Sequence, residues 1–353
     1  MAPDDTTEPL RLVDGPAVWH AGDLHADESW IWRLSADDLV EINAALKSAQ
    51  QNGVRMPTLR REDFPLPTLG PRLAATARDL DTGRGCLLLK GLELGQYQED
   101  EIRDIYWGMG RYLGTPMIQN AAGALIGSVR DSGRTIGEKN VRGYTTKNRM
   151  LPHCDPMDVV GLLCIHPAKR GGQSLIASTG AIYNEICRKH PEYLPTLLRG
   201  YHYDLRGEGP SGNSDEVTDN RVPVFSWWQD RMSCRFHGRS IREGMKKANE
   251  PLQGIDADAV DYVETLAADD RFRFDMDLEL GDIQILNNYA VLHARDGFED
   301  WPEQAKRRHL LRLWINLDAS IARPLDPVFA AKNNTGPRGA IHVQSDHSGW
   351  VPQ

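Results

Sequence analysis

The sequence has little cysteine and no long apolar run. Only five of its 353 residues are cysteines, and these are scattered, with no CxxC pair. An odd number of scattered cysteines favours free thiols in a reducing compartment over a disulfide framework. The first ten residues are acidic and lack the basic-then-apolar order of a signal peptide. No run of about 18 apolar residues occurs, so no membrane span is expected. These absences together favour a cytoplasmic protein.

Positive charge is also in deficit, because 41 Lys and Arg face 50 Asp and Glu, which gives a net charge of −9. An acidic chain is poorly suited to nonspecific nucleic-acid binding. We therefore expect a small-molecule partner, and homo-oligomerisation stays open. One stretch, residues 130–149, departs from this balance with six basic and two acidic residues. It is compatible with a solvated face or with part of a binding site.

The first third of the chain has helical periodicity. Ser35 is followed by Asp38 and then by apolar residues at helical spacing, which is the pattern of a capped helix. Further helices are expected near 71–81 and over 98–113. The short apolar run between them, 85–91, is of strand type.

Beyond about residue 116 the apolar period becomes that of strands. Strands are expected at 157–165, 173–178, 223–228, 271–278, 281–286 and 308–317, with helices near 179–190 and 256–268. Helices followed by strands indicate an α+β fold. We expect one domain over 1–353, with a helical part at about 30–115, a strand-rich core at about 116–320 and an unassigned tail at 321–353. The polar segment 207–220 reads as a loop, either an active-site lid or a plain surface excursion.

His153 and Asp155 are two residues apart at the end of an expected strand. Because side chains alternate across a strand, the imidazole and the carboxylate point to the same side and could offer one metal ion two ligands. His293, just after an apolar strand that starts at Gly281, is free to complete a triad. Two histidines and a carboxylate leave positions open for a chelating co-substrate and O₂, as in non-haem iron(II) oxygenases.

Two arginines lie on one face of the last apolar strand. Arg308 and Arg312 are four residues apart, so both belong to the same strand face. A guanidinium can grip a carboxylate through two parallel hydrogen bonds, and burying it without an anion is costly. We expect an anionic ligand at Arg308. For Arg312 a protein acid and a substrate group both remain open.

These residues occur in a pattern that resembles the taurine dioxygenase/TfdA-like branch of the iron(II)/2-oxoglutarate oxygenases. The pattern comprises H-C-D at 153–155, GGQS at 171–174, His293 and R-H-L-L-R at 308–312. The similarity extends to GCLLLKG, GTPMIQ at 114–119 and the order GDIQILNN…H, and covers roughly residues 80–317. The resemblance implies a distorted double-stranded β-helix (jelly-roll) core with flanking helices.

The resemblance also implies a chemistry. Fe(II), 2-oxoglutarate and O₂ would support decarboxylation of 2-oxoglutarate to succinate, coupled to C–H oxidation of a small organic substrate, hydroxylation above all. The metal ligands would be His153, Asp155 and His293, and the far carboxylate of 2-oxoglutarate would meet Arg308 and Ser174. An anionic or natural-product substrate would meet Arg312 and, from the basic stretch, Arg149. The presence of Asp155 disfavours the halogenating variants.

Two other readings stay open. A zinc-dependent hydrolase could use the same ligands with water in the open position, although it has no need of Arg308. A non-enzymatic jelly-roll binding protein could have kept the fold. Five further histidines are each expected to be packing or surface residues, and they are His166, His190, His202, His237 and His309. The thiol of Cys154 is expected to face the core, away from its two neighbours.

Overall fold

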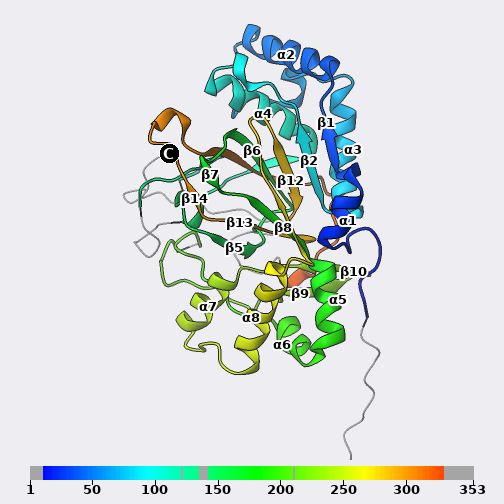
Figure 1. Ribbon diagram of the computed structural model, residues 1–353, viewed down its shortest axis with the longest axis vertical. Coiled ribbons are helices and arrows are strands. Elements are labelled where there is room, and N and C mark those ends of the chain that lie inside the picture. Colours follow the sequence, from blue (N-terminus) through cyan, green and yellow to red (C-terminus); the bar gives the residue numbers. More distant parts are fainter. Residues whose placement is uncertain (1–10, 121, 135–141, 210, 330–353) are drawn as a thin grey trace, which may run out of the picture.

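The protein is described by a computed structural model over residues 11–329, apart from 121, 135–141 and 210. Two β-sheets face each other, and helices cover their outer sides (Figure 1). The larger sheet has the order β1 (Ile31–Arg33), β2 (Cys86–Lys90), β12 (Ile283–Asn287), β6 (Val159–His166), β15 (His309–Asn316) and β3 (Thr115–Met117), with β4 (Gly127–Val129) also paired to β15. The smaller sheet has the order β11 (Arg273–Met276), β8 (Ser174–Ser178), β13 (Val291–Arg295) and β5 (Met150–His153).

The remaining elements are short pairs and helices. Two strand pairs stand apart, β7 (Arg170–Gly171) with β14 (Phe298–Glu299) and β9 (Phe225–Trp228) with β10 (Arg231–Cys234). The longer helices are α2 (Ala36–Gln51), α3 (Leu69–Thr82), α4 (Glu99–Leu113), α5 (Thr179–Lys189), α7 (Gly238–Lys247) and α8 (Ile255–Ala268), and the shorter ones are α1 (Ala21–Ala26) and α6 (Leu194–Arg199). None of the helices in the described part of the chain is both long and apolar enough to cross a membrane.

Strand alternation places each face of the larger sheet in a different core. On β15, Leu311 and Leu313 pack with α2, α3 and α4, whereas Leu310 and Trp314 face the smaller sheet. The smaller sheet in turn packs its outer side against α5 and α8. The inner core therefore lies between the two sheets, as expected of a jelly-roll with flanking helices.

Most of the elements expected from the sequence are present. Ser35 and Asp38 form the capping box that begins α2, and α3 covers the helix expected near 71–81. All five cysteines are free and buried, and Cys154 packs in the core between the smaller sheet and its helices. The helical first third also supplies two strands to the larger sheet. The strand expected at 85–91 is β2, whereas the sequence pattern did not indicate β1.

Two local expectations need correction. His293 does not follow the strand that begins near Gly281, because a turn at Asn288–Ala290 intervenes and His293 lies inside a separate strand, β13. Both strands are apolar, so periodicity alone merged them. The sequence also gave no signal for α6 and α7. Residues 135–141 of the basic stretch and 330–353 of the tail lie outside the described residues.

Candidate metal centre

The two histidines of the expected triad are direct neighbours across the smaller sheet. β5 and β13 run antiparallel, and their register pairs His153 with His293. Side chains that are directly opposite in such a ladder point to the same face with their Cβ atoms about 5 Å apart. The two ring centroids are 4.3 Å apart. The sheet register therefore fixes the relative position of the two imidazoles.

Asp155 lies just beyond the end of β5 and is held there by side chains from other elements. Its backbone N–H donates to Oδ1 of Asn288 over 3.0 Å, and Nδ2 of Asn288 donates to the carbonyl of Met157 over 3.0 Å. The indole N–H of Trp314 donates to Oδ2 of Asp155 over 2.7 Å. Such partners orient a ligand for its metal. Asn288 was missed because only its place in a turn against β5 gives it this function.

The ligand atoms converge without hydrogen bonding to each other. Nε2 of His153 is 4.0 Å from Oδ1 of Asp155, and Nε2 of His293 is 3.8 Å from Oδ2. All three ligand atoms lie within 4.8 Å of one another, and all three side chains are buried. Nδ1 of His153 donates to the carbonyl of Leu151 over 2.9 Å, which leaves Nε2 as a lone-pair donor toward the centre. The donor set therefore fits a divalent metal ion.

The protonation states also suit metal binding, which requires neutral imidazoles and an ionised carboxylate. Burial lowers the pKa of His293 to about 3 and that of His153 below its usual value. Burial alone would raise the pKa of Asp155, but the charge of Arg312 and the hydrogen bond from Trp314 hold it below its usual value. All three ligands are therefore ready to bind a cation at neutral pH.

Arg308, the residue expected to bind 2-oxoglutarate, is buried beside β15 with a free donor. Its Nη1 has no hydrogen-bond partner among the described residues. Burial lowers the pKa of its guanidinium to about 10, so it is still charged at neutral pH. An ideal Cβ added to Gly172 would be 3.0 Å from its Nε. A buried guanidinium with an unused donor fits an anionic ligand.

Ser174 is the first residue of β8. It is two residues from Ile176, which pairs with His293 on the neighbouring strand. Its hydroxyl donates to Oε1 of Gln284 over 2.9 Å, so it is buried and already oriented. Ser174 pairs with Arg295 across the ladder. The hydroxyl is thus on the same sheet as the candidate histidine ligands, and it would have to turn from the Gln284 amide to donate to a bound carboxylate.

Arg295 is a second buried arginine that the sequence reading missed. It follows His293 by two residues on β13 and therefore shares its strand face. Its Nη2 donates 2.9 Å to the carbonyl of Thr146, whereas its Nη1 has no partner among the described residues. The guanidiniums of Arg295 and Arg308 lie 4.7 and 5.2 Å from the ring centroid of Phe298. Both guanidiniums therefore lie against the Phe298 ring, and each has an Nη1 without a partner among the described residues.

Arg312 and Arg149 line a cavity of about 600 Å³ that His153 and Asp155 also line. Nε of Arg312 donates 2.8 Å to Oε1 of Gln119, and its Nη1 is 3.7 Å from Oδ1 of Asp155. Nε of Arg149 is 3.5 Å from Oδ1 of Asp296. The sequence left open whether Arg312 contacts a protein acid or a substrate group. In the structure the carboxylate of Asp155 is the protein acid near it.

The cavity also brings in residues with no sequence signal. His237, expected to be a packing or surface histidine, lines it with its ring centroid 5.1 Å from that of His153. Glu208 and Ser214 from the polar loop 207–220 line the same cavity. The loop therefore contributes to the wall of the cavity, which a plain surface excursion would not do.

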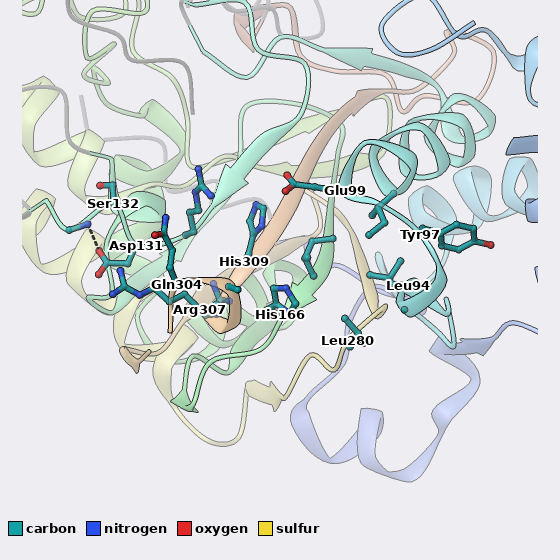
Figure 2. A pocket seen from close by; sticks show the side chains of 17 residues that line it. Leu94, Tyr97, Glu99, Asp131, Ser132, His166, Leu280, Gln304, Arg307 and His309 are labelled. Carbon is teal, nitrogen blue, oxygen red and sulfur yellow. Dashed lines mark hydrogen bonds between the residues drawn. The ribbon is translucent and has the colours of Figure 1, made fainter. Parts of the chain in front are cut away.

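A second cavity, of about 770 Å³, lies at the start of β15 (Figure 2). His309, His166, Glu99 and Gln304 line it, and so does Arg308. None of the three metal-ligand candidates lines it. This second cavity is therefore separate from the triad, although Arg308 lines it.

A jelly-roll with two histidines and one carboxylate converging at its inner face defines a mononuclear non-haem metalloenzyme. A family model described as "Taurine catabolism dioxygenase TauD, TfdA family" matches residues 51–314. The chain therefore belongs to the TauD/TfdA family, and it is a 2-oxoglutarate-dependent dioxygenase that uses iron.

Three relatives illustrate the similarity. The chain is 30% identical over 312 residues to "FR-33289 synthase" of Streptomyces rubellomurinus, which covers 87% of this chain and 91% of the relative. It is 29% identical over 322 residues to "Taurine hydroxylase-like protein SAT17" of Stachybotrys chartarum, covering 88% and 81%. A solved structure of asparagine oxygenase in complex with Fe(II), 3-hydroxyasparagine and succinate aligns with a TM-score of 0.63 at 16% identity, covering 86% and 98%. This last likeness confirms the jelly-roll fold.

Proposed function

We propose that His153, Asp155 and His293 hold the iron(II) and that Arg308 and Ser174 bind the far carboxylate of 2-oxoglutarate. The observation that carries this proposal is the convergence of three ligand atoms within 4.8 Å. The same fold buries an arginine, Arg308, with an unpaired donor among the described residues. A zinc hydrolase would have no use for that arginine. A binding protein without catalysis would have no use for the buried triad.

The metal and co-substrate supply the oxidising chemistry when bound, and the protein supplies position, charge and exclusion of water. Trp314 and Asn288 fix the carboxylate of Asp155. The backbone carbonyl of Leu151 sets the tautomer of His153. Burial of the triad keeps bulk water away from the reacting centre.

We propose further that the primary substrate is a small organic molecule with an anionic group, hydroxylated at a C–H bond. Arg312 and Arg149 line the cavity next to the triad, which supports an anion there. The asparagine oxygenase structure contains a hydroxylated amino acid, which is itself a small carboxylate. The position of Arg312 near Asp155 means that it also stabilises the charge of the metal ligand.

The test is an anaerobic titration of the full chain with ferrous iron and 2-oxoglutarate. Arg308→Gln removes a charge-assisted hydrogen bond and should weaken 2-oxoglutarate binding by roughly 10- to 150-fold, with iron affinity nearly unchanged. His293→Ala should fold but lose iron binding and turnover. An unchanged 2-oxoglutarate dissociation constant in Arg308→Gln would remove Arg308 from the site, and turnover retained by His293→Ala would remove His293.

A further inference from the structure

The cavity beside His153 and Asp155 carries more positive charge than its own acids balance. Six cationic side chains and four carboxylates line it. The proposed iron(II) and 2-oxoglutarate would add two charges of each sign, which cancel. A surplus of two positive charges therefore remains for the primary substrate. Such a surplus in a concave site favours an anionic ligand.

Four of the six cations already have partners. Nη2 of Arg142 is 2.9 Å from Oε1 of Glu208, and Nζ of Lys247 is 2.7 Å from Oδ1 of Asp204. Arg312 and Arg149 contact the residues described above. The two that remain are Arg206 and Arg239. In the described part of the chain, neither guanidinium has a carboxylate oxygen within 4.0 Å.

The backbone at Arg206 is fixed in an uncommon conformation. Its φ is +54°, in the left-handed region, and a side chain there costs roughly 1 kcal/mol. The N–H of Arg206 donates to Oδ1 of Asp204 over 2.8 Å, and its carbonyl accepts from Nη2 of Arg142 over 3.1 Å. The neighbouring cations and acids of the cavity thus hold the Arg206 backbone in place, while its guanidinium makes none of these contacts.

The Arg206 side chain lines the same cavity as His153 and Asp155. His237 lines this cavity as well, with its ring centroid 5.1 Å from that of His153. The Arg206 side chain is reachable by water although protein surrounds it, as expected for the wall of a concave cavity. Arg239, near the start of α7, also lines this cavity, and the N-terminus of that helix adds a partial positive charge.

We propose that Arg206, with Arg239, binds an anionic group of the primary substrate. This inference rests on the proposed function, because it assigns the substrate end of the same site. The ligand class is an organic acid whose anionic oxygens belong to a phosphate-type group or a carboxylate. Arg206 is then the specificity-determining residue, and Arg312 mainly supports Asp155.

The test uses the full chain loaded with Mn²⁺ and 2-oxoglutarate, with methyl phosphate and acetate as two probes in separate calorimetric titrations. Arg206→Gln should weaken binding of the preferred probe by roughly 10- to 150-fold, the range of a charge-assisted hydrogen bond. Arg206→Lys should recover part of the loss because it keeps the charge. Arg78→Gln, at an exposed position on α3, is the matched control and should bind like the wild type.

The outcomes separate the two proposals. Preference for methyl phosphate or for acetate identifies the anion class, and either preference supports the inference if Arg206→Gln abolishes it. Equal probe affinities in the wild type and Arg206→Gln, with Mn²⁺ and 2-oxoglutarate still bound, would overturn the inference and leave the proposed function intact. Failure of the wild type to bind Mn²⁺ and 2-oxoglutarate would instead count against the proposed function. A thermal melt of each variant shows whether it is folded.

Discussion

At the scale of single residues, Arg308 and His309 are adjacent in the sequence and both line the cavity at the start of β15. Nε2 of His309 is 3.3 Å from Oγ of Ser128. Burial lowers the pKa of His309 to about 4; Glu99 opposes this shift, and Arg130 and Arg103 add to it. His309 is therefore neutral in the folded protein at neutral pH.

This shift predicts a pH dependence of stability. In the unfolded chain a histidine has a pKa near 6.5, so between about pH 6.5 and pH 4 the unfolded state binds a proton that the folded state does not. The free energy of unfolding therefore falls as the pH decreases through this window. For His309 the loss between pH 7 and pH 5 should be about 2 kcal/mol. His309→Gln should lose about 2 kcal/mol less than the wild type in urea titrations of the metal-free protein. Equal losses in both proteins would show that His309 does not titrate in this way.

At the scale of elements, the Gly171–Gly172 segment positions Arg308. Both glycines have positive φ, +71° and +75°. A Cβ on Gly172 would lie 3.0 Å from Nε of Arg308 and 3.2 Å from Cβ of Phe298. The segment between β7 and β8 therefore lets the arginine lie against the backbone.

Gly172→Ala should displace the Arg308 guanidinium and weaken 2-oxoglutarate binding roughly tenfold, about the value of one charge-assisted hydrogen bond. Iron affinity should change little because no ligand moves. Gly133→Ala is the matched control, since Gly133 has the same φ of +75° but no atom within 4 Å of the added Cβ. Both variants carry the backbone strain, so only a difference in 2-oxoglutarate affinity supports the prediction. Equal 2-oxoglutarate affinities in the two variants would show that Gly172 does not position Arg308.

At the scale of the whole molecule, the segment after β15 joins distant parts of the fold. Nε of Arg323 is 2.6 Å from Oδ1 of Asp81 at the end of α3, and its Nη1 donates 3.0 Å to the carbonyl of Met232 on β10. Both charged side chains are 5% exposed. Phe329 packs in the core beneath the smaller sheet. The part of the expected tail that is described, 321–329, therefore belongs to the folded structure.

Arg323→Met should lower the free energy of unfolding by about 3–5 kcal/mol, because it leaves Asp81 buried with one of its two ion-pair partners removed. Urea unfolding measures this loss. Lys306→Met breaks an exposed ion pair, 64% and 57% exposed at 3.9 Å, and should change stability by less than about 0.5 kcal/mol. A loss of similar size in both variants would contradict a structural function for the 321–329 segment.

The sequence alone determined the parts of this protein that depend on short-range periodicity. His153 and Asp155 are two residues apart, so local spacing was enough to place both side chains on one side. The capping box at Ser35 was equally local. The order of the motifs indicated the family, and the family in turn implied iron and 2-oxoglutarate.

Only the tertiary structure decided which other residues join the site. Asn288 reaches Asp155 from a turn, His237 meets His153 at the start of α7, and Arg206 enters the cavity from the beginning of a loop. None of these positions follows from periodicity, because each depends on strand register and on contacts between segments far apart in the chain. The physical reason is that turns and loops have no repeat of their own, so their side chains are placed by the elements that they connect.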